Sequence, residues 1–170
     1  MNKYLETMNV DPLAIEAHEK GEKEYDTFHT IEFIQWGSTV KITKRSRVNN
    51  DLVVELQLGK ESVEYLPPGD RPKRSLAVSD NPGHLCIQSS LLTVNGKASV
   101  TDLKRLIQEE GDNSERSVMM QELTILNEQT GNSHTVVRYF NPCADLPPLV
   151  PVAVSPITTE AAAAAAAAAP

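Results

Sequence analysis

Residues 91–111 read Leu-Leu-Thr-Val-Asn-Gly-Lys-Ala-Ser-Val-Thr-Asp-Leu-Lys-Arg-Leu-Ile-Gln-Glu-Glu-Gly, and this stretch carries the strongest local signals in the chain. Asn95-Gly96 lies between apolar runs, and both residues tolerate the positive φ angles of a tight hairpin turn. Ser99 then precedes four apolar residues that share one helical face: Val100, Leu103, Leu106 and Ile107. Asp102 completes a short capping box, and Gly111 supplies a left-handed stop. The stretch therefore predicts a strand, a turn and a short amphipathic helix.

The remaining apolar residues follow a period of two. Residues 30–36 and 39–44 alternate around the Gly37-Ser38 turn, and residues 52–58 continue the pattern, which predicts a three-stranded antiparallel meander. Residues 84–89 and 91–94 are strand candidates, and 118–126 with 135–140 predict a second hairpin. We therefore expect an α+β fold, with a small, mainly antiparallel sheet, one amphipathic helix packed on it, and extended N- and C-terminal arms.

The length of 170 residues indicates about one domain. Residues 1–26 are expected to be a charged N-terminal arm with a short exposed helix after Asp11-Pro12; in an alternative, Leu13 and Ile15 dock onto another molecule. Residues 27–141 are expected to form the single α+β domain. Within it, Pro and Gly residues predict a long, mobile 59–83 loop without regular structure, and 142–170 is expected to be a Pro/Ala-rich tail.

The composition limits the classes of partner. A net charge of -7 opposes nonspecific binding to phosphates, so we expect no direct nucleic-acid contact. Cys86 and Cys143 fit neither a disulfide framework nor an all-cysteine zinc site. The N-terminus lacks a signal-peptide pattern, and no apolar run is long enough to span a membrane, so we expect an intracellular protein without membrane contact.

Catalytic motifs are missing from the sequence. The histidines are scattered singly, and no metal-site, phosphate-loop or nucleophile-elbow pattern occurs. His84 and Cys86 could form a base and nucleophile pair, but a structural cysteine beside a turn histidine is the simpler interpretation. We therefore expect a chain without catalytic residues, metal, cofactor or small-molecule substrate.

The candidate partner-binding residues are two basic clusters and one apolar strip in the tail. They are Lys41, Lys44, Arg45 and Arg47, then Arg71, Lys73 and Arg74, and finally Leu149, Val150 and Val152. Basic residues on outward strand positions often serve only solubility and edge protection. In the functional alternative, the basic clusters bind an acidic surface on a partner protein, and the apolar strip docks onto a partner.

One short motif resembles a known family. Ala98-Ser99-Val100-Thr101-Asp102-Leu103-Lys104-Arg105-Leu106-Ile107 is similar to the helix entry of the RAWUL domain, a ubiquitin-like module of Polycomb-group RING finger proteins. Asp102 stands where that family more often has His or Leu. The resemblance implies a noncatalytic domain that joins partner proteins in a chromatin complex.

Two functional hypotheses follow. The first is a noncatalytic protein–protein interaction module within a larger assembly, which binds by strand addition at a sheet edge. The second is a structural assembly subunit, such as a capsid-associated or scaffold protein, whose extended arms lock neighbouring copies together. Under both hypotheses the partners are other protein chains, and these can be copies of the same chain.

Overall fold

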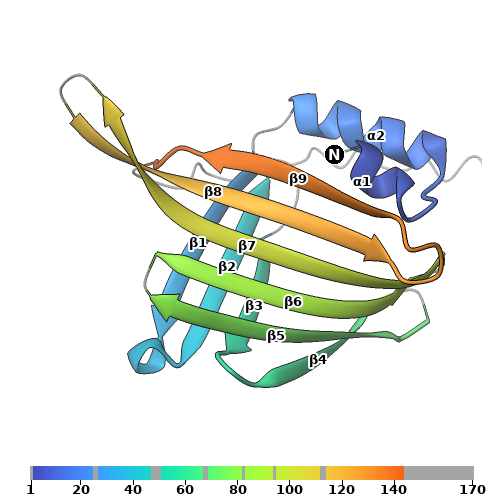
Figure 1. Cartoon of the computed structure of the whole chain (residues 1–170), viewed down its shortest axis with the longest axis horizontal. Helices are drawn as coiled ribbons and strands as arrows, with labels where there is room; N and C mark the ends of the chain where they lie inside the picture. The colour runs from blue at the N-terminus through green and yellow to red at the C-terminus, as the bar shows by residue number, and fades with distance from the viewer. Residues whose placement is uncertain are drawn as a thin grey trace, which may run out of the picture.

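The computed structural model describes residues 2–24, 27–46, 51–66, 69–81, 83–93, 95–111 and 114–143. These residues form two α-helices, a single 3-10 turn and nine strands (Figure 1). The elements in chain order are α1 (Asn2–Glu6), α2 (Pro12–Glu24), β1 (Thr27–Ile34), η1 (Gln35–Gly37), β2 (Thr39–Ser46), β3 (Leu52–Gln57), β4 (Glu61–Leu66), β5 (Arg71–Asn81), β6 (His84–Thr93), β7 (Gly96–Gly111), β8 (Ser114–Asn127) and β9 (Ser133–Phe140).

The described strands form two antiparallel sheets in which neighbours in sequence are neighbours in space. One sheet has the order β1-β2-β3, and the other has the order β4-β5-β6-β7-β8-β9. In Figure 1 the three-stranded sheet lies behind the curved six-stranded sheet, and its strands run across the longer ones. An isolated bridge between Leu58 and Ala77 links the two sheets. The fold is therefore a meander folded over on itself, with an interior between its two halves.

The predicted α+β architecture with one packed amphipathic helix is wrong. The stretch proposed as that helix lies in β7, which pairs with β6 from Gly96 to Arg105 and with β8 from Ala98 to Gly111. In the strand these apolar residues divide between the two sides, with Val100 and Leu106 on one side and Leu103 and Ile107 on the other, because alternate residues share a side. Pairing on both sides satisfies the backbone of β7 along most of its length, which a local helical pattern cannot reveal.

The prediction of an irregular 59–83 loop is also wrong. This segment contains β4 and β5, which pair antiparallel from Glu61↔Leu76 to Leu66↔Arg71. Pro72 is tolerated because the pairing of β5 with β6 begins only at Lys73. The turn-forming residues thus separate strands and do not prevent them.

The period-two predictions are confirmed. β1, β2 and β3 form the expected meander, in which Ile31 lies opposite Ile42 and Ile42 opposite Val54. β8 and β9 form the expected second hairpin, and Gly96 takes the positive φ angle that the β6–β7 turn requires. Alternating apolar residues beside a turn therefore locate these strands correctly.

Two apolar clusters hold the layers together. The first joins both sheets through Val40 and Leu56 of the smaller sheet and Ala77, Leu85 and Ile87 of the larger one. In the second cluster, the N-terminal segment packs on the larger sheet: Met8 and Tyr4 lie against Ala98 and Ile125. The segment 2–24 also contains the expected helix after Pro12, with Ile15 buried and Leu13 exposed.

Asn127 fixes the N-terminal segment to the end of β8. It is fully buried; its Nδ2 donates to the Thr7 carbonyl at 3.0 Å, and its Oδ1 accepts from the backbone N–H groups of Gln129 and Thr130. We predict that Asn127→Ala costs about 1–2 kcal/mol and increases amide exchange mainly in residues 3–10, because these hydrogen bonds are lost. Asn132→Ala, an exposed change in the same turn, is the control; equal exchange in both variants would contradict the prediction.

Candidate functional site

An interior cavity of about 610 Å³ lies between the two sheets. The smaller sheet contributes Ile42, Val54 and Leu56 to its walls. The larger sheet contributes alternate residues of β6, β7 and β8, since one side of each strand faces inward. Half of these are apolar, namely Ile87, Leu91, Val100 and Leu123. We call this space the interior cavity.

A row of polar side chains crosses the apolar wall. Lys104 of β7 lies opposite Gln121 of β8, and Gln121 lies opposite Arg138 of β9. Asp102 lies two residues before Lys104 on the same side of β7; it accepts hydrogen bonds from the Lys104 ammonium and from Gln121 Nε2, the latter at 2.8 Å. Lys104 is only 4% exposed. A buried ion pair of this kind needs such additional hydrogen bonds to offset the loss of hydration.

His29 of β1 lies at the border of the interior cavity. Its ring stacks on Phe140 of β9, with 4.7 Å between the ring centroids. Both ring nitrogens are shielded from solvent, and neither has a hydrogen-bond partner within the described residues. Burial, followed by the nearby Lys44 ammonium, lowers the pKa of His29 to about 4. The ring is therefore neutral at pH 7, with an N–H donor and a nitrogen acceptor both unused.

Tyr4 of α1 brings the N-terminal segment to the same cavity. Its side chain lines the cavity, and burial raises its pKa to about 12, with a further contribution from the Asp102 carboxylate. The hydroxyl therefore keeps its proton at pH 7 and can donate a hydrogen bond. The helix α1 thus contributes the Tyr4 hydroxyl to the cavity as well as apolar contacts with the larger sheet.

A second hollow of about 460 Å³ lies beside the first, and we call it the side groove. Ile31 and Phe33 of β1 form one wall, and Leu85, Leu106 and Met119 of the larger sheet form another. His29 and Lys104 line both hollows. The two spaces therefore meet at these two residues.

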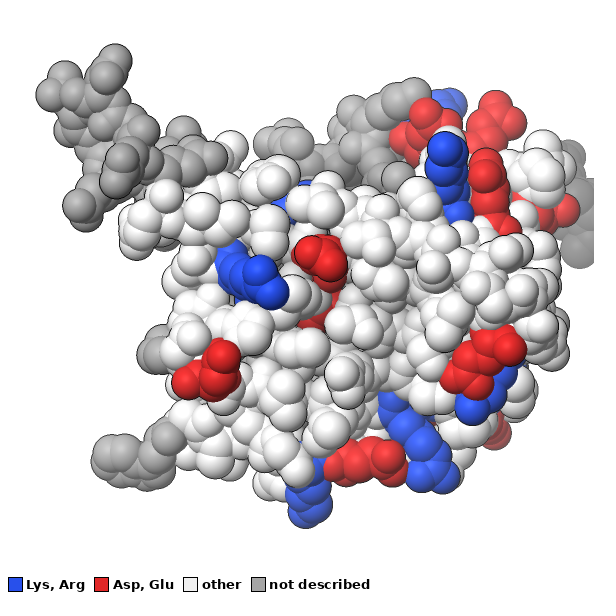
Figure 2. All heavy atoms as spheres, in the orientation of Figure 1, with Lys and Arg blue, Asp and Glu red and all other residues white. Residues whose placement is uncertain are grey.

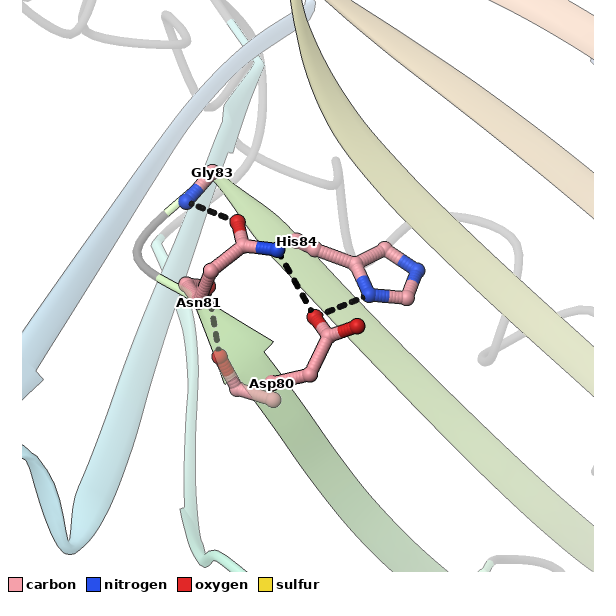
Figure 3. Close-up of polar contacts among 5 residues, drawn as sticks. Asp80, Asn81, Gly83 and His84 are labelled. Carbon is pink, nitrogen blue, oxygen red and sulfur yellow. Dashed lines mark hydrogen bonds and ion pairs between the residues drawn. The ribbon is translucent and has the colours of Figure 1, made fainter.

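The side groove also contains a histidine oriented by a carboxylate (Figure 3). His84 Nδ1 lies 2.5 Å from Asp80 Oδ1, which also accepts a hydrogen bond from Asn81 Nδ2, and the hydrogen bond to His84 lowers the pKa of Asp80. The register of β5 with β6 shifts between Val78 and Asn81, just before the turn that joins the two strands. His84 Nε2 is buried without a hydrogen-bond partner in the described chain, so no hydroxyl or thiol there is positioned as a nucleophile for it.

The cysteine considered as a nucleophile has unsuitable surroundings. Burial raises the pKa of the Cys86 thiol, whereas an activated thiol needs a lowered pKa. The described residues also contain no group of three or more His, Cys, Asp or Glu side chains that could hold a metal ion.

Except for Arg47, the sequence-predicted basic residues lie on β2 and β5. Arg45 makes two hydrogen bonds of 2.6 Å with Asp51, while Lys73 pairs with Glu64 at 3.2 Å and Arg74 with Glu61 at 2.9 Å. Lys44 and Lys73 both line the interior cavity. Of the other candidates, Lys41 is on β2 and Arg71 on β5, and Arg47, Leu149, Val150 and Val152 lie outside the described residues.

These ion pairs give the exposed charges a mixed pattern. Figure 2 shows basic and acidic side chains alternating along the lower edge of the molecule, where Figure 1 places β4 and β5. The face in view shows no continuous basic patch among the described residues. The structure thus brings Lys44 and Lys73 together at the cavity, while Arg45 and Arg74 pair locally with carboxylates.

The residues at the centre of the site were not predicted from the sequence. Tyr4, His29, Asp102, Lys104 and Gln121 all line the interior cavity. A usable signal was that Ala98 and Val100 share one side of a strand with Asp102 and Lys104, because charged residues are unusual on an inward side. Tyr4, His29 and Gln121 join the site from other strands and from α1, and no local pattern marks them.

The pKa of His29 predicts a pH dependence of stability. The folded ring accepts a proton only near pH 4, whereas the unfolded imidazole does so near 6.5. Proton uptake by the unfolded chain therefore lowers stability as the pH falls from about 6.5 to about 4, by on the order of 2 kcal/mol after a discount for partial solvent exposure. Urea unfolding at several pH values measures this loss.

His29→Phe is the matched variant, since it keeps a ring on Phe140 and removes both nitrogens. Its stability should vary less than that of the parent chain between pH 6.5 and 4.5. Hydrogen bonds hold the pKa values of Asp51, Asp80 and Glu128 low, so these carboxylates add their own losses only at lower pH. An equal loss in both chains would contradict the assignment to His29.

Comparisons with protein-family models, with curated proteins and with solved structures find no match for this chain. The fold and the site therefore define its class directly: an antiparallel β-protein of two sheets with an interior cavity. No helix in the described part of the chain is long and apolar enough to cross a membrane. The resemblance to the RAWUL domain stays a prediction, although the residues that carry it form part of β7.

Proposed function

We propose that this protein binds a small, mainly apolar molecule in the interior cavity. The observation that carries the proposal is the cavity itself: about 610 Å³, lined by aliphatic side chains from both sheets and by a similar number of polar and charged ones. Ligand sites in proteins have volumes of roughly 300–1,000 Å³ and combine apolar walls with polar groups that orient the ligand. Closed or nearly closed antiparallel sheets provide such cavities because their inward side chains leave space around the axis.

The described structure also suggests where a ligand enters. The apolar residues Leu52, Val53 and Val63 line the cavity and are exposed to solvent. They belong to β3 and β4, which are edge strands of the smaller and the larger sheet. These exposed apolar residues mark the route by which an apolar ligand would enter.

A neutral fluorescent compound tests the proposal directly. N-phenyl-1-naphthylamine fluoresces more strongly in an apolar environment, so saturable enhancement with the purified full chain is expected. Ser89→Trp should abolish the enhancement, because Ser89 lines the cavity and an indole would fill it. Gln88→Trp is the control, since Gln88 is the preceding residue of β6 and is exposed.

The outcomes separate binding in the cavity from binding elsewhere. Thermal unfolding followed by circular dichroism must first show that both tryptophan variants are folded. Saturable binding that survives Ser89→Trp as well as Gln88→Trp would place the compound outside the cavity. Absence of binding to the parent chain, for this compound and for apolar ligands measured by native mass spectrometry, would contradict the proposal.

A second proposal keeps the noncatalytic protein–protein interaction module. The observation in its favour is β4, an edge strand of the larger sheet with Val63 and Tyr65 exposed. Strand addition uses such an edge, with backbone hydrogen bonds for affinity and alternate side chains for specificity. Light scattering tests the version in which copies of this chain pair through β4. A molar mass that rises with concentration, and no longer does so in Val63→Lys, would support this assembly. A constant monomer mass would contradict it.

A further inference from the structure

The charged side chains that line the interior cavity balance one another. They are three lysines and three carboxylates, namely Lys44, Lys73, Lys104, Glu55, Glu64 and Asp102. Asp102 pairs with the Lys104 ammonium. Glu64 pairs with Lys73 at 3.2 Å. The walls of the cavity therefore carry no excess of either charge.

A charged ligand has little to pair with among these residues. Lys44 takes part in an interaction and so is not free, and the same holds for Arg138, which also acts on the His29 ring. The Glu55 side chain is exposed, so water screens its carboxylate. An ion that leaves water needs a counter-charge or several hydrogen bonds, because the loss of its hydration is otherwise not offset. An uncharged ligand avoids that cost.

His29 offers hydrogen bonds that an uncharged group can use. It lines the interior cavity, and neither of its ring nitrogens has a hydrogen-bond partner within the described residues. Its pKa of about 4 keeps the ring neutral at pH 7, so one nitrogen carries a hydrogen and the other a lone pair. Buried polar groups are nearly always paired, so two unpaired nitrogens on one ring indicate a ligand contact.

A hydroxyl group matches this ring. It donates one hydrogen and accepts through its oxygen, so it can bond to either nitrogen in either tautomer. An ether oxygen only accepts, and it can therefore use the N–H nitrogen alone. Elsewhere in the cavity Ile42, Leu91 and Leu123 provide aliphatic walls, which favour an apolar body behind the hydroxyl group.

We propose that the ligand of the interior cavity is an uncharged apolar alcohol, whose hydroxyl group bonds to a ring nitrogen of His29 while its apolar body lies against the aliphatic walls. This inference rests on the proposed function and names its ligand class. It involves hydrogen bonds and apolar contacts alone, so no covalent bond is made or broken.

Four ligands with one apolar chain test the head group. Decanol has the hydroxyl group, methyl decyl ether keeps the oxygen without the donor, and decanoate and decylammonium carry opposite charges at pH 7.5. Each is used below the concentration at which it self-associates, at fixed ionic strength. Decanol is expected to displace N-phenyl-1-naphthylamine from the full chain at a concentration about threefold or more below that of each other ligand. The ether is the more apolar of the two uncharged ligands, so a cavity that recognised only apolarity would prefer it.

Two matched variants locate the hydroxyl group. His29→Phe keeps a ring against Phe140 and removes both nitrogens, so the preference for decanol over the ether should be lost. His84→Phe makes the same change at a second histidine with a buried, unpaired nitrogen, which lines the side groove and is not among the residues that line the interior cavity. The preference should survive there. Circular dichroism checks that both variants are folded, and each preference is a ratio of two displacements within one variant.

The outcomes distinguish this inference from the proposed function. If the ether, decanoate or decylammonium displaces N-phenyl-1-naphthylamine from the parent chain as readily as decanol does, the alcohol inference is overturned and cavity binding stands; this result needs no variant. A decanol preference that a folded His29→Phe retains, or that a folded His84→Phe loses, would place the hydroxyl group elsewhere and also overturn it. Absence of binding by N-phenyl-1-naphthylamine and by all four ligands would overturn the proposed function, and this inference with it.

Discussion

Replacing Asp102 with alanine is expected to lower the free energy of unfolding by about 3–5 kcal/mol, the largest loss from one change among these charged residues. Lys104 is 4% exposed, and Asp102 is its hydrogen-bond acceptor among the described residues. Removal of the carboxylate leaves a buried ammonium without a counter-charge and leaves Gln121 Nε2 without its acceptor. Urea unfolding at pH 7.5, followed by circular dichroism, measures the loss.

The double variant Asp102→Ala with Lys104→Met is the decisive control. It removes both charges and fills the lysine site with an apolar side chain of similar length, so most of the stability should return. Glu128→Ala, which breaks the exposed pair with Lys97, should cost at most about 1 kcal/mol. If Asp102→Ala cost no more than Glu128→Ala, water would be hydrating Lys104 and the interior pair would not be buried in solution.

The sequence allowed the first meander and the last hairpin to be predicted because their signals are local. In β2, Val40 and Ile42 alternate with polar residues, and a turn at Gly37-Ser38 fixes where the strand begins. A period of two beside a turn has few alternative structures. The register of β1 with β2 then follows from the hairpin.

β7 could not be predicted in the same way because its residues are ambiguous. Val100, Leu103, Leu106 and Ile107 fit a helical face, and Ser99 and Gly111 resemble helix ends. The deciding contribution comes from β6 and β8, whose hydrogen bonds to β7 lie outside any local window. Tertiary pairing therefore overrides local helix signals here.

The site was missed for the same reason. Lys104 and Asp102 would be ordinary surface charges on a helix, but on the inward side of β7 they face a cavity. His29 acquires its role only when β1 approaches Phe140 at the end of β9, more than a hundred residues later in the chain. The polar residues of the cavity thus depend on the folded topology and have no motif of their own.

The contact between the two sheets provides the second large prediction, which concerns Leu85. This side chain of β6 is 3% exposed and packs with Val40 and Leu56 of the smaller sheet. Leu85→Ala is expected to cost about 2–5 kcal/mol, because the lost contacts leave a void that neighbouring strands cannot fully close. Leu92→Ala is the matched control, since Leu92 lies on the same strand but is 45% exposed, and it should cost less than about 1 kcal/mol.

Ligand binding should partly offset the Leu85→Ala loss. Leu85 also lines the side groove, so truncation enlarges an apolar space beside the interior cavity. A ligand that binds only the folded chain raises stability by an amount set by its concentration relative to Kd. Saturating N-phenyl-1-naphthylamine should therefore raise the urea midpoints of the parent chain, Leu92→Ala and Leu85→Ala alike. Equal losses for Leu85→Ala and Leu92→Ala without ligand would show that the sheets do not pack through Leu85, and the cavity between them would then lose its structural basis.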